Sequence, residues 1–208
     1  MSLFDRYFKA YDAWYDKNQF AYLSELEALK KVMPKTGRGL EIGVGTGRFA
    51  VPLEITMGID PSHNMLEIAG QRGVNTCWGV GEDLPFLDHA FDYVVIIITL
   101  CFVDDPRKVL QEAIRVLEKE GRLVIGIIDK DSFLGRFYQT KKSAFYKKAR
   151  FFTVKELTDL LKAVGFNEFS YYQTLFQLPY EMTSIDRPRK GSGNGGFVVI
   201  TTHKPLVK

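Results

Sequence analysis

The sequence predicts an α/β fold in which helices flank a doubly wound, mainly parallel sheet. Residues 39–49 indicate a short apolar strand that ends in a glycine-rich turn, and Asp60 follows at the end of a second apolar run. Glycine suits such a turn because a sharp reversal needs backbone angles that hinder other residues, and because a ligand can then approach the peptide groups closely. Residues 94–98 are all valine or isoleucine, which is typical of a strand buried on both faces of a parallel sheet.

Length and composition indicate one globular domain. The chain has 208 residues, of which 46% are hydrophobic and 25% charged, and its formal net charge is +3, so we expect a single domain over 1–208. Cys77 and Cys101 lie in apolar runs and form neither a disulfide framework nor a metal-ligand spacing, so no metal is expected. The beginning of the chain lacks a signal pattern, and the apolar run over 94–103 is too short to cross a bilayer. We therefore expect a cytoplasmic protein without a membrane partner.

The glycine turn distinguishes two nucleotide-binding patterns. A dinucleotide-binding turn reads G-x-G-x-x-G, but Arg48 occupies its third glycine position. The turn has instead an acid before three alternating glycines, Glu41-x-Gly43-x-Gly45-x-Gly47. This pattern resembles the motif of class I S-adenosylmethionine-dependent methyltransferases of the small-molecule type.

The resemblance implies a Rossmann-like doubly wound sheet of seven strands with an antiparallel last strand. It implies S-adenosylmethionine as cofactor and S-adenosylhomocysteine as product. It places Glu41 near the amino-acid end of the cofactor, lines the cofactor with the glycine backbone, and assigns the ribose hydroxyls to Asp60. A carboxylate suits a ribose because its two oxygens accept from two neighbouring hydroxyls. NAD-binding proteins place an acid similarly, so Asp60 alone does not distinguish the two cofactors.

The first 35 residues are rich in aromatic and charged side chains. Aromatic residues recur at steps of three and four from Phe4 to Tyr15, which predicts a helix with an aromatic stripe on one face. The simpler interpretation is a helix that packs this stripe on the domain. The segment over 10–16 is also similar to the N-terminal segment of small-molecule methyltransferases, where aromatic side chains close over the cofactor. That resemblance makes Tyr15 and Tyr11 candidate cofactor contacts.

Helices and strands alternate after the glycine turn. We expect a short helix to about residue 52, a strand over 55–59, a helix with Ser62 as its N-cap, and a third strand over 74–80. Strand four follows at 93–100.

The loop after the third strand resembles the acidic-Leu-Pro-Phe loop that binds the adenine edge in this family. By this resemblance Gly81, Glu82 and Asp83 are cofactor-binding residues. The family commonly has an aspartate where this chain has Val80, so the contact with the adenine amine passes to Glu82 or Asp83, or is lost to water. A solvated acidic turn remains the alternative for both acids.

The end of strand four brings Thr99 and Cys101 to the crevice where open α/β sheets bind ligands, and Thr99 is a further cofactor candidate. Residues 99–102 lack the Asn/Asp-Pro-Pro-aromatic signature of enzymes that methylate the amino groups of bases. Cys101 lacks the Pro-Cys context of cytosine-5 methyltransferases, and apolar neighbours raise the pKa of such a thiol. We therefore expect no nucleophilic role for it.

The last part of the chain adds an insert to a minimal fold. A helix is expected from Asp105 and Pro106, and strand five follows it. Residues 130–152 then interleave seven basic with seven aromatic residues, which suits a solvated cover, a lid over the substrate, or a nucleic-acid platform. We expect no nucleic-acid partner. Thr153 and Glu156 form a capping box for a helix that ends at Gly165, and strands at 166–177 and 197–202 complete the sheet.

These patterns predict an enzyme that transfers a methyl group from S-adenosylmethionine to a small-molecule acceptor, mainly by positioning and desolvation. No general base is evident, and His63, His89 and His203 are expected to be surface or capping residues. The alternatives are an RNA or protein methyltransferase, a non-catalytic binder of the cofactor, and an NAD(P)-dependent oxidoreductase. The acceptor and the oligomeric state are not assigned. The predicted segments are a helical cap (1–35), a cofactor-binding core (36–129), the insert (130–152), and a C-terminal helix and hairpin (153–208).

Overall fold

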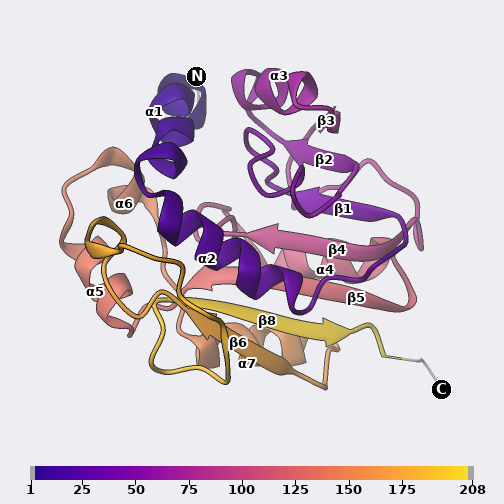
Figure 1. Cartoon of the computed structure of the whole chain (residues 1–208). Helices are drawn as coiled ribbons and strands as arrows, with labels where there is room; N and C mark the ends of the chain where they lie inside the picture. Colours follow the sequence, from indigo (N-terminus) through magenta and orange to yellow (C-terminus); the bar gives the residue numbers. More distant parts are fainter. Residues whose placement is uncertain (1–2, 206–208) are drawn as a thin grey trace.

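The computed structural model describes residues 3–205 and places one sheet between two layers of helices (Figure 1). The strands are β1 (Gly39–Ile42), β2 (Met57–Asp60), β3 (Asn75–Trp78), β4 (Phe91–Ile97), β5 (Leu117–Ile128), β6 (Ser170–Thr174), β7 (Arg189–Lys190) and β8 (Phe197–His203). The helices are α1 (Leu3–Lys17), α2 (Gln19–Lys30), α3 (His63–Gln71), α4 (Pro106–Val116), α5 (Phe133–Thr140), α6 (Ala144–Lys148) and α7 (Val154–Ala163), with a 3-10 turn at Pro179–Glu181.

The sheet order is β3-β2-β1-β4-β5-β8-β6-β7. The first five strands in this order are parallel, whereas β8 runs antiparallel to β5 and to β6. This arrangement confirms the predicted doubly wound sheet with an antiparallel last strand. The structure adds an eighth strand, β7, whose two residues pair with the edge of β6.

Strand β4 is buried on both faces, as its continuous apolar run predicts. Val95 and Ile97 belong to a cluster that also contains side chains of α1, α2, α3 and α5. Val94 and Ile96 belong to the opposite cluster, with side chains of α4 and α7. In Figure 1, α2 crosses in front of the sheet, and α4 and α7 lie behind it.

Three predicted helix starts are confirmed by their capping bonds. The side chain of Ser62 accepts from the backbone N–H of Met65 at the start of α3. Asp105 caps α4 in the same way, with Pro106 as the first helical residue. At α7 both hydrogen bonds of the capping box between Thr153 and Glu156 are present. Each cap satisfies backbone donors that would otherwise lack a partner.

The helix predicted directly after the glycine turn is wrong. Residues 43–54 form turns, with isolated helical bonds such as the one from the Leu53 N–H to the Phe49 carbonyl. Gly43, Gly45 and Gly47 all have positive φ, so the backbone leaves the right-handed region at every second residue. Glu54, with φ 57°, ends the segment. Strand β2 consequently begins two residues later than predicted.

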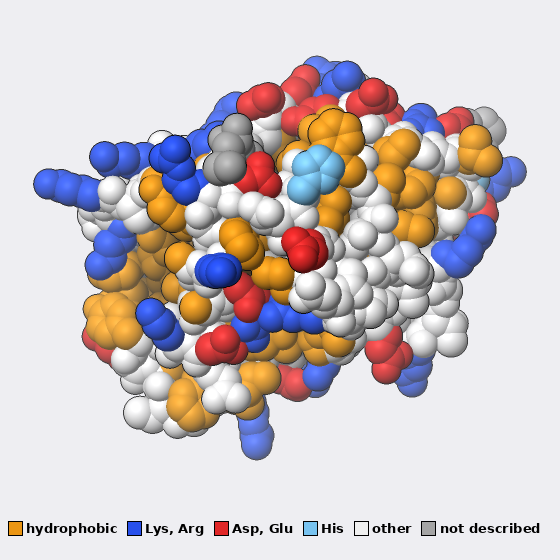
Figure 2. Space-filling model, turned by 90° about the horizontal axis from the view of Figure 1, so that it is seen from above, with side chains coloured by type: hydrophobic (Ala, Val, Ile, Leu, Met, Phe, Trp, Pro, Cys, Tyr) orange, Lys and Arg blue, Asp and Glu red, His pale blue; other side chains and the backbone are white. Residues whose placement is uncertain are grey.

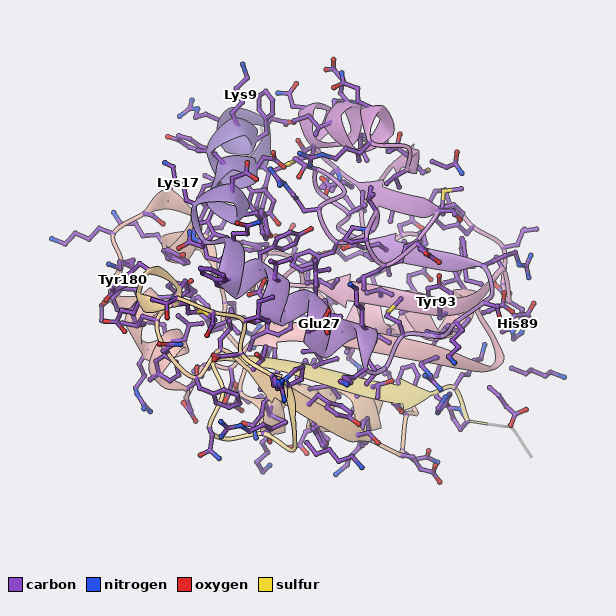
Figure 3. The ribbon with its side chains drawn as sticks, viewed as in Figure 1. Lys9, Lys17, Glu27, His89, Tyr93 and Tyr180 are labelled. Carbon is purple, nitrogen blue, oxygen red and sulfur yellow. The ribbon has the colours of Figure 1, made fainter. Side chains whose placement is uncertain are left out.

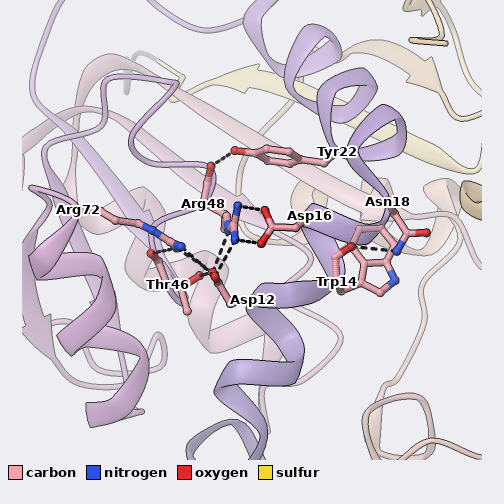
Figure 4. A network of polar contacts seen from close by, with 8 residues as sticks. All are labelled: Asp12, Trp14, Asp16, Asn18, Tyr22, Thr46, Arg48 and Arg72. Carbon is pink, nitrogen blue, oxygen red and sulfur yellow. Dashed lines mark hydrogen bonds and ion pairs between the residues drawn. The ribbon is translucent and has the colours of Figure 1, made fainter. Parts of the chain in front are cut away.

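Helix α1 is fastened to the glycine turn by a network of charges (Figure 4). Asp12 on α1 accepts hydrogen bonds from Thr46 Oγ1 at 2.6 Å, from Arg48 Nη2 at 2.7 Å and from Arg72 Nη1 at 2.8 Å. Arg48 also pairs with Asp16. Burial opposes ionisation of Asp12, but the hydrogen bonds from Arg48 and Arg72 outweigh it and hold the pKa of this carboxyl far below its ordinary range. The residue that breaks the dinucleotide pattern, Arg48, therefore anchors the N-terminal helix.

Replacing Asp12 by Asn is expected to loosen α1 and to destabilise the protein by about 2–3 kcal/mol, because two partly buried guanidinium groups lose their carboxylate. Hydrogen exchange over 3–17 and the unfolding midpoint measure both effects. Asp16→Asn is the control: the Asp16 side chain is 67% exposed and binds only one of the two arginines, so its loss should cost less than about 1 kcal/mol. Equal effects of the two variants would contradict the anchoring role of Asp12.

Candidate functional site

The carboxyl ends of β1, β2, β4 and β5 point the same way, toward the side of α1 and α6 (Figure 1). A cavity of about 210 Å³ lies there, and we call it the turn cavity. Open α/β sheets bind ligands at this edge. Seven of the residues predicted to contact the cofactor line this cavity: Tyr11, Gly43, Gly45, Asp60, Gly81, Glu82 and Thr99.

The glycine turn forms a bare floor to the turn cavity. Gly43 and Gly45 have φ values of 74° and 54°, which favour glycine. A β-carbon on Gly43 would overlap the side chain of Thr99, whose hydroxyl donates a 3.0 Å hydrogen bond to the Ile97 carbonyl. A β-carbon on Gly45 would lie 3.6 Å from the ring of Tyr11. Gly43 therefore lets Thr99 pack directly against the turn, and Gly45 leaves the backbone without a side chain beside Tyr11 of α1.

Asp60 is held rigidly at the wall of the same cavity. Its Oδ2 accepts from the N–H of Gly45 at 3.0 Å, and its Oδ1 accepts from the N–H of Ser62 at 2.9 Å. The residue is 8% exposed, and its burial raises the pKa of the carboxyl while these two N–H donors lower it. Each oxygen accepts one backbone bond and retains capacity for a further donor such as a hydroxyl.

Glu41 lies behind the turn and does not line the turn cavity. It is 2% exposed, and its Oε2 has no hydrogen-bond partner within residues 3–205. Burial, followed by the charge of Asp60, raises the pKa of Glu41 well above its ordinary value, against a backbone hydrogen bond from Ala50. A buried carboxylate oxygen without a partner is costly, so a positively charged or donor group of a ligand would stabilise it.

The other predicted residues have different surroundings. Glu82 Oε1 accepts from the backbone N–H groups of Asp104 and Asp105, which fastens the loop that precedes α4. Asp83 is exposed and lies outside the cavity lining, and Gly47 packs against α3. Contact of these residues with the cofactor stays a prediction.

The structure adds wall residues that the motifs do not reveal. Phe4 and Phe102 meet edge to face, with ring centroids 5.0 Å apart, and both line the turn cavity. Val80 and Lys148 also line it. Phe4 belongs to the predicted aromatic stripe and Lys148 to the insert, so the sequence singles out both segments. Their position at the cavity depends on the tertiary fold.

A second cavity, of about 270 Å³, adjoins the first, and we call it the aromatic cavity. The two cavities share Tyr11, Ile98 and Phe102 as lining residues. Tyr15 lines the aromatic cavity rather than the turn cavity, and its hydroxyl donates to that of Tyr11 at 2.8 Å. Cys101 also lines it, and burial raises the pKa of this thiol to about 12, which agrees with the prediction that it is not a nucleophile.

No histidine among residues 3–205 lines either cavity. His89 lies with Tyr93 at the opposite end of the sheet from α1 (Figure 3), and its Nδ1 is 3.0 Å from the Leu117 carbonyl oxygen. His63 stacks on the exposed ring of Trp78. No described helix combines the length and the apolar composition that a bilayer crossing needs.

Comparisons with known proteins identify the family. Residues 40–125 match the family described as Methyltransferase domain. A crystal structure from Thermotoga maritima, described as an S-adenosylmethionine-dependent methyltransferase and possible histamine N-methyltransferase, has a TM-score of 0.94 and 51% identity over 97% of each chain. A demethylmenaquinone methyltransferase of Bacillus licheniformis is 30% identical over 80% of this chain and 70% of its own length. An uncharacterised protein of Methanocaldococcus jannaschii is 48% identical over 98% of this chain and all of its own.

These matches agree with the sheet order and with the acid-glycine turn, and they confirm the resemblance noted in the sequence. They exclude the alternative of an NAD(P)-dependent oxidoreductase, because the cofactor of this family is S-adenosylmethionine. The chain belongs to the class I S-adenosylmethionine-dependent methyltransferases.

Proposed function

We propose that this enzyme methylates a small-molecule acceptor bound in the aromatic cavity. The observation that supports this proposal is the shared wall of Tyr11, Ile98 and Phe102 between the two cavities. A molecule in the aromatic cavity would lie directly beside a cofactor in the turn cavity. The names of two relatives, a demethylmenaquinone methyltransferase and a possible histamine N-methyltransferase, also denote small acceptors for those proteins.

The residues around the turn cavity fit the cofactor. The left-handed Gly43 and Gly45 expose their backbone at the cavity wall, Asp60 presents two oxygens suited to neighbouring hydroxyls, and Glu41, behind the turn, has a buried oxygen without a partner among residues 3–205. We propose that these residues hold the ribose and the amino-acid end, with Gly81 and Glu82 beside the base. The bound cofactor would supply an electrophilic methyl group. The protein then has to orient the acceptor and exclude water, and such positioning alone is worth roughly 7–11 kcal/mol.

The position of the insert over 130–152 supports the hypothesis that this segment is a lid over the substrate. Phe145, Tyr146 and Phe151 line the aromatic cavity, and Lys148 lines the turn cavity. The N–H of Arg150 donates to the carbonyl of Cys101 at 2.7 Å, which ties the lid to the loop after β4. We propose that this segment covers the acceptor.

Most basic side chains of the lid are exposed, and one of them, Lys148, also lines the turn cavity. Figure 2 shows many Lys and Arg side chains on the side of α1, α5 and α6, with hydrophobic side chains between them. Several of the lid's aromatic rings are used as cavity walls, so fewer remain for stacking on bases. A small acceptor therefore explains the insert better than a nucleic acid does.

A thermal-shift comparison tests the cofactor assignment. S-adenosylmethionine and S-adenosylhomocysteine at about 100 times their dissociation constants should each stabilise the protein by roughly 2.7 kcal/mol, while NAD should not. Asp60→Ala should remove most of the response, because a rigidly held acceptor of two hydroxyl bonds is lost. A response to NAD, or an unchanged response of Asp60→Ala, would contradict the proposed site.

Filling the aromatic cavity tests the acceptor assignment. Ala149 lines this cavity but not the turn cavity, so Ala149→Phe should leave binding of S-adenosylhomocysteine within about threefold and reduce methylation of small acceptors at least tenfold. The assay measures S-adenosylhomocysteine formed from a panel of amines, phenols and quinols, with RNA and protein mixtures as further substrates. Turnover on RNA or protein alone would refute the proposal.

A further inference from the structure

A buried carboxyl group lies in the wall of the aromatic cavity. Glu25 on α2 is 1% exposed and lines the cavity. Its Oε2 has no hydrogen-bond partner among the residues that the structure describes. A buried carboxyl group without a hydrogen-bond partner destabilises a folded protein, because apolar neighbours do not replace the hydrogen bonds that it made with water. The arrangement therefore points to a partner that arrives from the cavity.

The remaining wall suits a cation. The rings of Trp14, Tyr11 and Tyr15 come from α1, and those of Tyr138 and Tyr146 come from α5 and α6. The last two stack with centroids 4.5 Å apart. Aromatic faces attract ammonium groups, by about 2 kcal/mol or more where water is excluded. Within the described part of the chain, no Lys, Arg or His lines this cavity, so no basic side chain competes for the carboxyl.

Glu25 is the group there that titrates near neutral pH. Burial raises its pKa to about 8. Among residues 3–205, the titratable groups near it are a thiol and five phenols whose pKa values burial also raises, so they stay neutral at pH 8. They are Tyr11 and Tyr15 on α1, Tyr22 on α2, Tyr138 on α5, Tyr146 on α6, and Cys101 after β4.

We propose that Glu25 binds the positively charged amino group of the acceptor, which is therefore a small amine with an aromatic or apolar body. The inference rests on the proposed function only in taking the aromatic cavity as the acceptor site. At neutral pH the protonated carboxyl of Glu25 releases its proton to solvent as the ammonium binds. Binding therefore forms an ion pair inside the cavity and releases one proton to the buffer.

Calorimetry with a matched pair of probes tests the inference. 2-Phenylethylamine and 2-phenylethanol have the same body and differ in the charged group. With the protein saturated by S-adenosylhomocysteine at pH 7, the amine should bind at least tenfold more tightly than the alcohol. Titrations in buffers of different ionisation enthalpy should show the release of about one proton per amine bound and none for the alcohol.

Three variants make the test specific. Glu25→Gln should weaken the amine at least tenfold, abolish proton release and leave the alcohol unchanged. Glu25→Asp keeps the charge, so it should retain proton release with an intermediate loss of affinity. Glu27→Gln is the matched control, because Glu27 lies on the same helix with a side chain that is 48% exposed (Figure 3), and it should behave as wild type. Unchanged affinity for S-adenosylhomocysteine shows that each variant is folded.

The outcomes separate this inference from the proposed function. Equal binding of the two probes, or an amine affinity that Glu25→Gln does not change, would overturn the role of Glu25 and leave the cavity as an acceptor site. Failure of both probes to bind the loaded protein would overturn the inference, and if turnover were then found only on RNA or protein, the proposed function would fall with it.

Discussion

A Gly43→Ala variant is expected to lose most of its affinity for S-adenosylmethionine and about 2–5 kcal/mol of stability. Gly43 has a φ of 74°, and a β-carbon there would overlap the side chain of Thr99. A left-handed alanine costs roughly 1–2 kcal/mol, and an overpacked neighbour typically adds about 1–3 kcal/mol. Relief of the overlap would displace Gly43 or Thr99, and both line the turn cavity, so binding suffers together with stability. Denaturant unfolding and titration with S-adenosylhomocysteine measure the two effects.

Gly73→Ala is the matched control for this substitution. Gly73 has a φ of 94°, but a β-carbon there meets no atom within 4 Å. This variant should show only the backbone cost of roughly 1–2 kcal/mol and unchanged cofactor affinity. If Gly43→Ala resembled it in both measurements, the turn would not be the tightly packed cradle that the site requires.

The elements that the sequence predicted correctly are those decided by local interactions. Residues 94–97 form a buried strand because their side chains suit burial whichever neighbours cover them, whereas Ile98, with a φ of 51°, already lies beyond the strand. Ser62 and Thr153 begin helices because each side chain bonds to a backbone N–H three residues later. Such bonds form within one short segment and do not depend on the rest of the chain.

The failures have tertiary causes. The turn over 43–54 contains enough helix-forming residues to suggest a helix, but its conformation follows from contacts that a β-carbon would break, such as that of Gly43 with Thr99. Strand β7 has two residues and exists through its pairing with Tyr172 and Gln173 of β6. Nothing within the segment over 187–196 distinguishes it from a plain loop.

The candidate site also combines features that the local sequence predicts with features that only the tertiary fold creates. Its predicted acids and glycines belong to local motifs, and most of them line the turn cavity. Glu25 could not be found in this way. It and Glu27 flank Leu26 in one helix, and the sequence treats them alike, yet one is buried and the other exposed. The difference arises because α2 packs against α1 and against β6 and β8, and Glu25 lies in the wall of the aromatic cavity.

Glu25→Gln is expected to stabilise the free protein at pH 8 by about 3–4 kcal/mol more than at pH 5. The carboxyl has a pKa near 4.5 when unfolded and about 8 when folded. Between these values the unfolded chain releases a proton that the folded protein keeps. Stability is therefore fully retained below pH 4.5 and falls by up to about 1.4 kcal/mol per pH unit until pH 8. Glutamine keeps the shape and removes the titration, so unfolding midpoints of the two proteins should diverge as the pH rises, by about 10 °C at pH 8.

Glu27→Gln separates this effect from a general change of charge, because Glu27 is half exposed beside Lys30 and should give a nearly constant difference from wild type at every pH. A constant difference for Glu25→Gln as well would mean that the pKa of Glu25 is the same in the folded and the unfolded protein, and it would contradict the proposed release of a proton when the amine binds. An amine that pairs with the carboxylate should reverse the loss. Saturating 2-phenylethylamine should therefore stabilise wild type more at pH 8 than at pH 6, because less work is then needed to remove the proton of Glu25, and it should stabilise Glu25→Gln equally at both.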